Sequence, residues 1–394
     1  MQENFKVIRK RLVEYVNMLM SENGYMYAGY PRFMELFGRD SIISAVELFH
    51  LYPEILKKTL ISLAGQQGKV YNAETGEEPG KIPHELANPE TFRYYPEKEK
   101  WVKPNVPLYY SVDSTPLFVF ACELYIKNTN DSDFLNYIRA YMDRAVSMMI
   151  KKSQKTGFLT YNASEIENRL ATQGWMDGSW GIYGKLSGDI ALIEVQGYFY
   201  QSLKIYNELF PGNPVAKVIA DRLNFMENYI DPYFWMEDQE YYSPAVFFSG
   251  KDRERIDTVS SSAGHLLLTE IVSRNRKKSM VKRIFQGDMA TPWGIRTISS
   301  ESKCFDPYKY QSGSIWPHDN WIILHGLRHS GFNEEAELLE SYILNAISSV
   351  KYPYEYYSVD LNNNIINMEM LEVPPCMPQA WSTGAFIGVL DNKS

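Results

Sequence analysis

Apolar residues recur at helical spacing along almost the whole chain, and strand-like alternation is scarce. This pattern predicts twelve helices, at 3–22, 39–52, 54–67, 112–127, 131–152, 188–208, 214–229, 258–273, 275–286, 313–330, 333–350 and 378–390. Asp40 and Ser41 follow Gly38 and are typical helix caps, and Asp113 precedes Pro116, which suits a cap followed by a first-turn proline. The sequence is therefore expected to be mostly helical.

The connections between these helices alternate in length. Short ones fall near 53 and at 128–130, 209–213, 274 and 331–332, and long ones fall at 23–38, 68–111, 153–187, 230–257, 287–312 and 351–377. If consecutive helices run antiparallel, every long loop emerges on one face. Long loops in a compact protein are usually functional, so this face is the expected active face.

Six helical hairpins closed into a ring would form a double-layered barrel. We therefore predict an all-α fold of the (α/α)6-barrel class, the six-hairpin toroid, with residues 1–394 as a single catalytic domain. The alternative is an open solenoid of hairpins serving as a binding scaffold. Such arrays show a repeated sequence unit, and none is visible in this chain.

Composition narrows the choice of partners. The formal net charge of −8 argues against nucleic acid, whose binding rests on clustered Lys and Arg. No stretch approaches the run of apolar residues that a membrane span needs, and the charged N-terminus lacks a signal-peptide core. The three cysteines, Cys122, Cys304 and Cys376, lack metal-type spacing and suit buried thiols. A cytoplasmic protein is expected.

Chemically capable residues gather in the long loops. They lie in the runs FGRD (37–40), GKIPHE (80–85), YSVDST (110–115), TQGWMDG (172–178), TPWGIR (291–296), YQSGSIWPHDN (310–320), NMEMLE (367–372) and PQAW (378–381). Tryptophan rings stack on the apolar face of a sugar, and carboxylates, guanidinium groups and amides bond its hydroxyls. This combination on one face favours a sugar site.

Cleavage of a glycosidic bond needs two carboxyl groups, one donating a proton and one handling water or the anomeric carbon. Asp177, between Trp175 and Gly178, is the predicted acid, because a nearby apolar ring could keep it protonated. Glu369 and Glu372 in the last long loop are candidate partners. No metal-ligand spacing, phosphate-binding glycine loop or serine nucleophile elbow is present, so no metal or cofactor is expected.

The ordered runs FGRDS, GKIPHE, YSVDSTP, QGWMDG, EVQGY, AGHLL, WGIRT, YQSGSIWPHDN and PQAW resemble the amylo-α-1,6-glucosidase portion of glycogen debranching enzymes. They span residues 37 to 381. The resemblance implies an (α/α)6 barrel related to glucoamylases, trehalases and mannosylglycerate hydrolases. It also implies an inverting mechanism without a metal.

By position in these motifs, Asp177 matches the general acid. Glu369 is the predicted base and Glu372 the reserve, because the family's Leu-Pro-Glu run reads Asn367-Met368-Glu369 here. The loop motifs and the resemblance together give a set of expected sugar-binding residues. These are Arg39, Asp40, His84, Asp113, Gln173, Trp175, Gln196, Trp293, Arg296, Trp316, His318, Asp319 and Trp381.

The expected activity is inverting hydrolysis of α-linked glucose, as an α-1,6-glucosidase of short branched gluco-oligosaccharides or of glycogen and dextrin stubs. The expected partner is an oligosaccharide or glucan, and the expected state a monomer or small homo-oligomer. The chain starts close to its first helix, without the N-terminal portions of larger relatives, which favours small substrates. The alternatives are hydrolysis of trehalose or mannosylglycerate on the same fold, a sugar epimerase using paired histidines, and a non-catalytic glycan-binding protein.

Overall fold

The computed structural model describes residues 2–89, 92, 103–162, 172–178, 188–250 and 252–392. Its helices are α1 (Gln2–Leu19), α2 (Gly38–Glu47), α3 (Pro53–Gly65), α5 (Ser114–Thr129), α6 (Ser132–Lys152), α8 (Ile193–Leu209), α9 (Ala216–Phe234), α10 (Arg274–Ile284), α11 (Pro317–His329), α12 (Asn333–Val350) and α13 (Ala380–Asp391), with 3-10 helices η3 (Ser261–Leu268) and η4 (Met368–Met370). Each of the twelve predicted helices has a helical counterpart.

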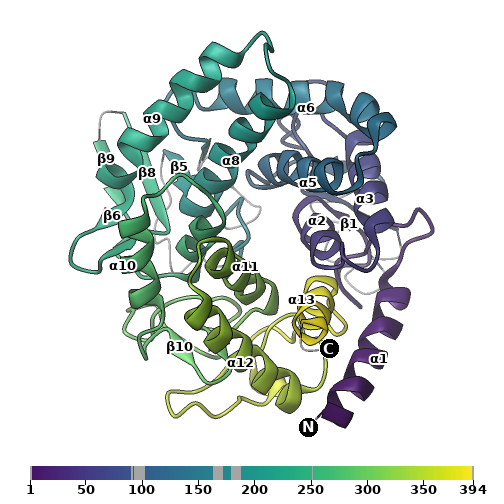
Figure 1. Ribbon diagram of the computed structural model, residues 1–394, viewed down its shortest axis with the longest axis vertical. Coiled ribbons are helices and arrows are strands. Elements are labelled where there is room, and N and C mark those ends of the chain that lie inside the picture. The colour runs from purple at the N-terminus through teal and green to yellow at the C-terminus, as the bar shows by residue number, and fades with distance from the viewer. Residues whose placement is uncertain are drawn as a thin grey trace.

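The helices form two concentric layers (Figure 1). Neighbours in the inner layer touch in the order α2, α5, α8, η3, α11, α13 and back to α2, so the layer closes on itself. Each inner element also packs against an outer helix: α2 against α3, α5 against α6, α8 against α9, η3 against α10, α11 against α12 and α13 against α1. The predicted (α/α)6 barrel is confirmed, and the open solenoid is excluded.

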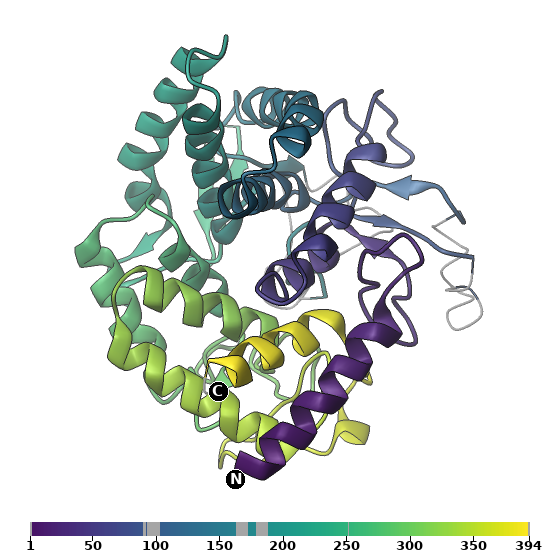
Figure 2. The ribbon, with the colours of Figure 1, turned by 45° about the vertical axis from the view of Figure 1, so that its right-hand side comes forward.

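The chain closes the ring by pairing its first helix with its last (Figure 2). α1 packs along α13, so both ends of the chain meet at one place in the barrel wall. Inner helices are buried almost all round, as α13 shows, whereas outer helices are amphipathic. The apolar core fills the space between the layers.

Short strands lie in the segments between the helices. One antiparallel sheet has the order β1 (Leu36–Phe37), β2 (Glu85–Leu86), β3 (Pro107–Leu108), and another has the order β4 (Tyr161–Asn162), β5 (Asp189–Leu192), β8 (Ala245–Ser249), β9 (Asp252–Arg255). Two-stranded ribbons pair β6 (Trp235–Met236) with β7 (Tyr241–Tyr242) and β10 (Ala290–Thr291) with β11 (Gly294–Ile295). The β1–β2 pairing sets Phe37 opposite Glu85.

Three local predictions need correction. Residues 189–192 form β5 rather than the start of a helix, because these four buried residues pair with β8. The 258–273 segment contains a 3-10 helix of eight residues instead of an α-helix. Asp40 lies in the first turn of α2, whose N-cap is Phe37, so it does not cap the helix.

Glu47 offers a test of the packing between α2 and α13. Its carboxyl is fully buried, and an added Cβ at Gly384 of α13 would lie 2.5 Å from its Oε2. Burial raises the pKa of Glu47 well above its ordinary value, although the backbone N–H of Ala385 opposes this rise. The folded protein therefore holds a proton that the unfolded chain releases as the pH rises above the ordinary pKa.

We expect Glu47→Gln to raise the melting temperature, and to do so more at pH 8 than at pH 5. Wild-type stability falls with rising pH between the unfolded and folded pKa of Glu47, and the amide removes this loss. Thermal unfolding at both pH values measures the effect. Glu340→Gln, which breaks the 2.5 Å ion pair with Arg328, is the control and should lower the melting temperature. An equal effect of Glu47→Gln at both pH values would contradict the account.

Candidate active site

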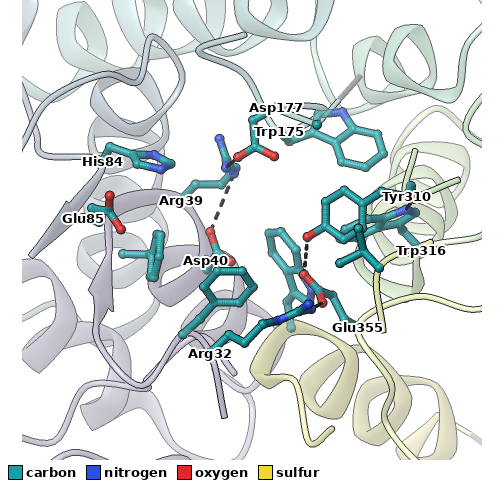
Figure 3. A pocket seen from close by; sticks show the side chains of 15 residues that line it. Arg32, Arg39, Asp40, His84, Glu85, Trp175, Asp177, Tyr310, Trp316 and Glu355 are labelled. Atoms are coloured by element: carbon teal, nitrogen blue, oxygen red, sulfur yellow. Dashed lines mark hydrogen bonds and ion pairs between the residues drawn. The ribbon is translucent and has the colours of Figure 1, made fainter. Parts of the chain in front are cut away.

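A cavity of about 290 Å³ opens among the loops that the sequence places on the long-loop face (Figure 3). Its walls come from the start of α2, the β1–β2 sheet, and the loops before α8, α11 and α13. The lining residues are Arg32, Phe33, Phe37, Arg39, Asp40, His84, Glu85, Trp175, Asp177, Gly178, Tyr310, Trp316, Glu355, Val373 and Trp381. Carboxyl groups, guanidinium groups and aromatic rings therefore face one another across it.

Arg39 joins the acids on one side of the cavity. Its Nη1 donates to Asp113 at 2.9 Å, its Nη2 donates to Asp177 at 2.9 Å, and its Nε lies 3.7 Å from Asp40. The guanidinium is buried, with a side chain 4% exposed. Burial alone would lower the pKa of Arg39, but the charges of Asp113, Asp177 and Asp40 raise it above the ordinary value. This single cation therefore hydrogen-bonds two carboxyl groups and lies near a third.

Asp177 can hold a proton at mildly acidic pH. Burial raises its pKa to about 6, the charges of Asp113 and Glu355 add to this rise, and Arg39 opposes it. Asp40 behaves similarly, because burial raises its pKa to about 7 against the opposing charge of Arg39. Both carboxyl groups line the cavity.

Glu355 lies across the cavity from Asp177, in the loop between α12 and α13 (Figure 3). The Tyr310 hydroxyl donates to its Oε1, and the Arg32 guanidinium and the Cys376 backbone N–H donate to its Oε2 at 3.0 Å each. An ionised carboxyl only accepts hydrogen bonds. Three donors from three directions therefore match a carboxylate in a fixed orientation.

Aromatic rings form the remaining wall. Trp316 is packed edge-to-face against Tyr310, Trp175 and Trp381, with ring centroids 5.0, 5.8 and 5.8 Å apart, and it stacks on Tyr356. Such contacts fix the rings. Trp175, Trp316 and Trp381 line the cavity, where an aromatic ring can stack on the apolar face of a sugar.

A layer of buried polar residues lies behind this wall. His318 stacks on Trp381 with centroids 3.8 Å apart, and in the described residues neither of its ring nitrogens has a hydrogen-bond partner. Burial lowers the pKa of His318 well below its ordinary value, and the nearby His265 and Arg39 lower it further. His318 is therefore neutral. The Asp319 carboxyl lies 2.8 Å from Nε2 of His265, within hydrogen-bond distance.

Six of the predicted sugar-binding residues line the cavity, together with the predicted acid Asp177. The six are Arg39, Asp40, His84, Trp175, Trp316 and Trp381. A seventh, Asp113, lies in the layer directly behind, where it is 1% exposed and accepts a hydrogen bond from Arg39. Asp113 can therefore act on the cavity through Arg39 but does not line it.

Three of the other predicted sugar-binding residues hydrogen-bond the surrounding backbone. Gln196 bonds the backbone of Leu159 and Leu192, Arg296 donates to carbonyl groups that include Val359, and the Trp293 indole donates to the Asn363 carbonyl. Gln173, His318 and Asp319 are buried behind the cavity wall. These six residues do not line the cavity.

Glu369 and Glu372 also lie outside the cavity. Both are exposed, and the Glu369 backbone N–H is capped by the Asn367 side chain in the short helix η4. The structure therefore does not bring either residue to Asp177, although it brings Glu355 from the same long loop.

Four residues that line the cavity were not predicted as site residues: Glu355, Arg32, Tyr310 and Glu85. Glu355 had a usable signal, since it lies in a long loop among Tyr354, Tyr356 and Tyr357. An acid beside aromatic residues in a long loop was the criterion that selected Asp177. The partners of Glu355 come from distant segments and carried no local signal.

The described residues were also compared with the requirements of a metal site and of a membrane-spanning helix. Across the described ranges, no three His, Cys, Asp or Glu side chains are grouped as metal ligands. Among the helices of those ranges, none combines the length and apolar content needed to cross a membrane.

Comparisons with known proteins place this architecture among glycosidases. Residues 210–362 match the family model described as the mannosylglycerate hydrolase MGH1-like glycoside hydrolase domain. A curated mannosylglycerate hydrolase from Rubrobacter radiotolerans is 26% identical over 95 residues, which are 23% of this chain and 21% of that protein. The chain thus aligns with about a fifth of the length of that relative.

Solved structures match over the whole barrel. The GH63 mannosylglycerate hydrolase from Thermus thermophilus in complex with Tris and D-glycerate has a TM-score of 0.74 at 13% identity, over 98% of this chain and 100% of that chain. The same enzyme with glucose has a TM-score of 0.70 at 13% identity, over 98% and 99% of the two chains. These matches support the wider glycosidase group that the motifs indicated, and not the amylo-α-1,6-glucosidases specifically. The chain therefore has the (α/α)6-barrel fold of the GH63 mannosylglycerate hydrolases, and its residues 210–362 match their MGH1-like glycoside hydrolase domain.

Proposed function

We propose that the protein is an inverting glycoside hydrolase that removes a terminal α-linked hexose from a small glycoside. The observation that carries this proposal is the pair of carboxyl groups, Asp177 and Glu355, that face one aromatic-walled cavity. A glycosidase needs two such groups on opposite sides of the scissile bond. The cavity of about 290 Å³ suits one sugar ring and a small leaving group.

In this proposal Asp177 is the general acid and Glu355 replaces Glu369 as the general base. Asp177, protonated below its pKa of about 6, donates to the glycosidic oxygen. Glu355 accepts a proton from a water molecule, whose oxygen attacks the anomeric carbon from the opposite face as the glycosidic bond breaks. Trp175, Trp316 and Trp381 hold the ring, and Asp40 accepts bonds from its hydroxyls.

Mannosylglycerate is the first candidate substrate, because the family match and the matched structures named above are mannosylglycerate hydrolases. An α-1,6-linked glucoside is the second, because the ordered loop motifs resemble amylo-α-1,6-glucosidases and several of their residues line the cavity. Release of free sugar from mannosylglycerate, glucosylglycerate, trehalose, isomaltose and panose separates the two. Turnover of none of them would reject the proposed hydrolase.

The acid assignment predicts that Asp177→Asn lowers kcat by about 10²–10⁴-fold, the usual contribution of general acid–base catalysis. Sugar binding should persist, because the amide keeps the shape of the side chain. Steady-state kinetics and calorimetric titration with the free sugar measure the two effects. Near-normal turnover would reject Asp177 as the acid.

The base assignment is tested by a matched pair of variants. Glu355→Gln should lower kcat by about 10²–10⁴-fold, because the amide cannot take a proton from water. Glu369→Gln, in the same loop but exposed, should leave kcat unchanged. The reverse result would restore Glu369 as the base.

The acid must be protonated, so kcat/KM should fall as the pH rises through the pKa of Asp177, about 6. The charge of Asp113 raises the pKa of Asp177. Asp113 also accepts a hydrogen bond from Arg39, the cation that lowers this pKa. Asp113→Asn should therefore lower the pKa of Asp177 and move the basic limb of the pH profile to lower pH. A limb that stays in place or moves to higher pH would contradict the assignment.

A further inference from the structure

Two consecutive residues, Tyr310 and Gln311, connect the two sides of the cavity. The Tyr310 hydroxyl donates to Oε1 of Glu355. The Gln311 side chain reaches the opposite loop, where its Nε2 donates to the Trp175 carbonyl at 2.8 Å and its Oε1 accepts from the Gly178 N–H at 2.8 Å. One dipeptide therefore bonds both the carboxyl proposed as base and the loop that carries the proposed acid.

The two bonds of Gln311 enclose Asp177. Trp175 lies two positions before Asp177, and Gly178 lies directly after it. The side-chain amide of Gln311 therefore hydrogen-bonds the backbone on either side of Asp177. Gln311 is 1% exposed and does not line the cavity, so bulk water does not compete for its amide. Buried hydrogen bonds of this kind fix the backbone firmly.

Packing against Tyr310 also stabilises the loop that carries Asp177. A Cβ added at Gly178 would lie 2.7 Å from the Tyr310 ring, so the acid loop rests directly on Tyr310. The Gln311 backbone is itself held, because the Thr297 hydroxyl donates to its carbonyl at 3.0 Å and accepts from the Gly313 N–H at 2.9 Å. The dipeptide is thus a rigid spacer between the two loops.

We propose that Gln311 is a positioning residue that, through the Tyr310–Gln311 spacer, sets the separation between the carboxyl groups of Asp177 and Glu355. The inference rests on the proposed function, in which these two groups are acid and base. Inversion requires a separation that leaves room for one water molecule. A spacer anchored on both loops holds that separation more tightly than either loop could alone.

The test compares two classes of substrate. A glycoside with an alkoxide leaving group needs the acid to protonate the departing oxygen, whereas an α-hexosyl fluoride releases fluoride with little proton donation. In both reactions the oxygen of a water molecule forms the new bond to the anomeric carbon, and Glu355 accepts a proton from that water. Loss of acid positioning should therefore slow the glycoside and spare the fluoride.

We expect Gln311→Met, which keeps the length of the side chain and removes both bonds, to lower kcat on the glycoside by about 10- to 100-fold, as a small misplacement of a catalytic group does. Turnover of the matching fluoride and KM should change little. Tyr310→Phe removes the bond to Glu355 and should slow both substrates. Equal losses on both substrates in Gln311→Met would overturn the positioning role, and so would an unchanged kcat on the glycoside.

Gln67→Met is the matched control. Gln67 is also a buried glutamine that donates to two backbone carbonyls, those of Gly80 at 3.0 Å and Tyr141 at 2.9 Å, and its Oε1 accepts from Arg144 at 2.8 Å. None of these partners belongs to the loop of Asp177. It should lower the melting temperature without changing the ratio of glycoside to fluoride turnover. A changed ratio in this control would assign the effect to lost stability and not to Gln311.

A crystal structure of Gln311→Met separates this inference from the proposed function. The inference expects the Asp177 carboxyl to shift relative to Glu355, whether or not any glycoside is hydrolysed. An unmoved Asp177 would overturn the spacer. A wild-type protein inactive on every glycoside and fluoride would instead reject the proposed function, and the crystal structure would still decide the role of Gln311.

Discussion

The site depends on one buried cation. Arg39 lies in the first turn of α2 with Asp113, Asp177 and Asp40 around its guanidinium. Without it, the buried carboxyl groups of Asp113 and Asp40 and the partly buried one of Asp177 would lie close together with no cation among them. A buried charge is tolerated only when it is paired. Three acids around one cation leave a shortage of positive charge, so protonation supplies the balance. That shortage, together with burial, places the pKa of Asp177 at about 6 and that of Asp40 at about 7.

The barrel brings these groups together from distant parts of the chain. Arg39 comes from α2, Asp113 from the N-cap of α5, Asp177 from the loop before α8, and Glu355 from the loop before α13. All four lie near the same end of the ring because inner helices run in the same direction and their preceding loops are long. Asp113 occupies a helix N-cap, yet its side chain bonds Arg39 instead of capping α5.

Much of this arrangement could be predicted from the sequence. Each helix of the described barrel overlaps a helix expected from the sequence. The outer helices are amphipathic and so give a repeating pattern, whereas an inner helix such as α13 is apolar on nearly all sides. The alternation of loop lengths identified the face on which the cavity opens. The place of Asp177 in the cavity could be expected because Trp175, which also lines it, lies two positions away in the sequence. β5 was mistaken for helix because its four buried residues run directly into α8.

The position of Glu355 could not be predicted by spacing from a motif. The loop from 351 to 377 is long enough to present Glu355, Glu369 or Glu372 to the cavity, and the choice rests on tertiary contacts with Arg32 and Tyr310. Proton NMR of the first sugar released from an α-linked substrate tests the central claim most directly. Single displacement by Asp177 and Glu355 predicts that the β-anomer appears first. Early appearance of the α-anomer would show retention and contradict the account.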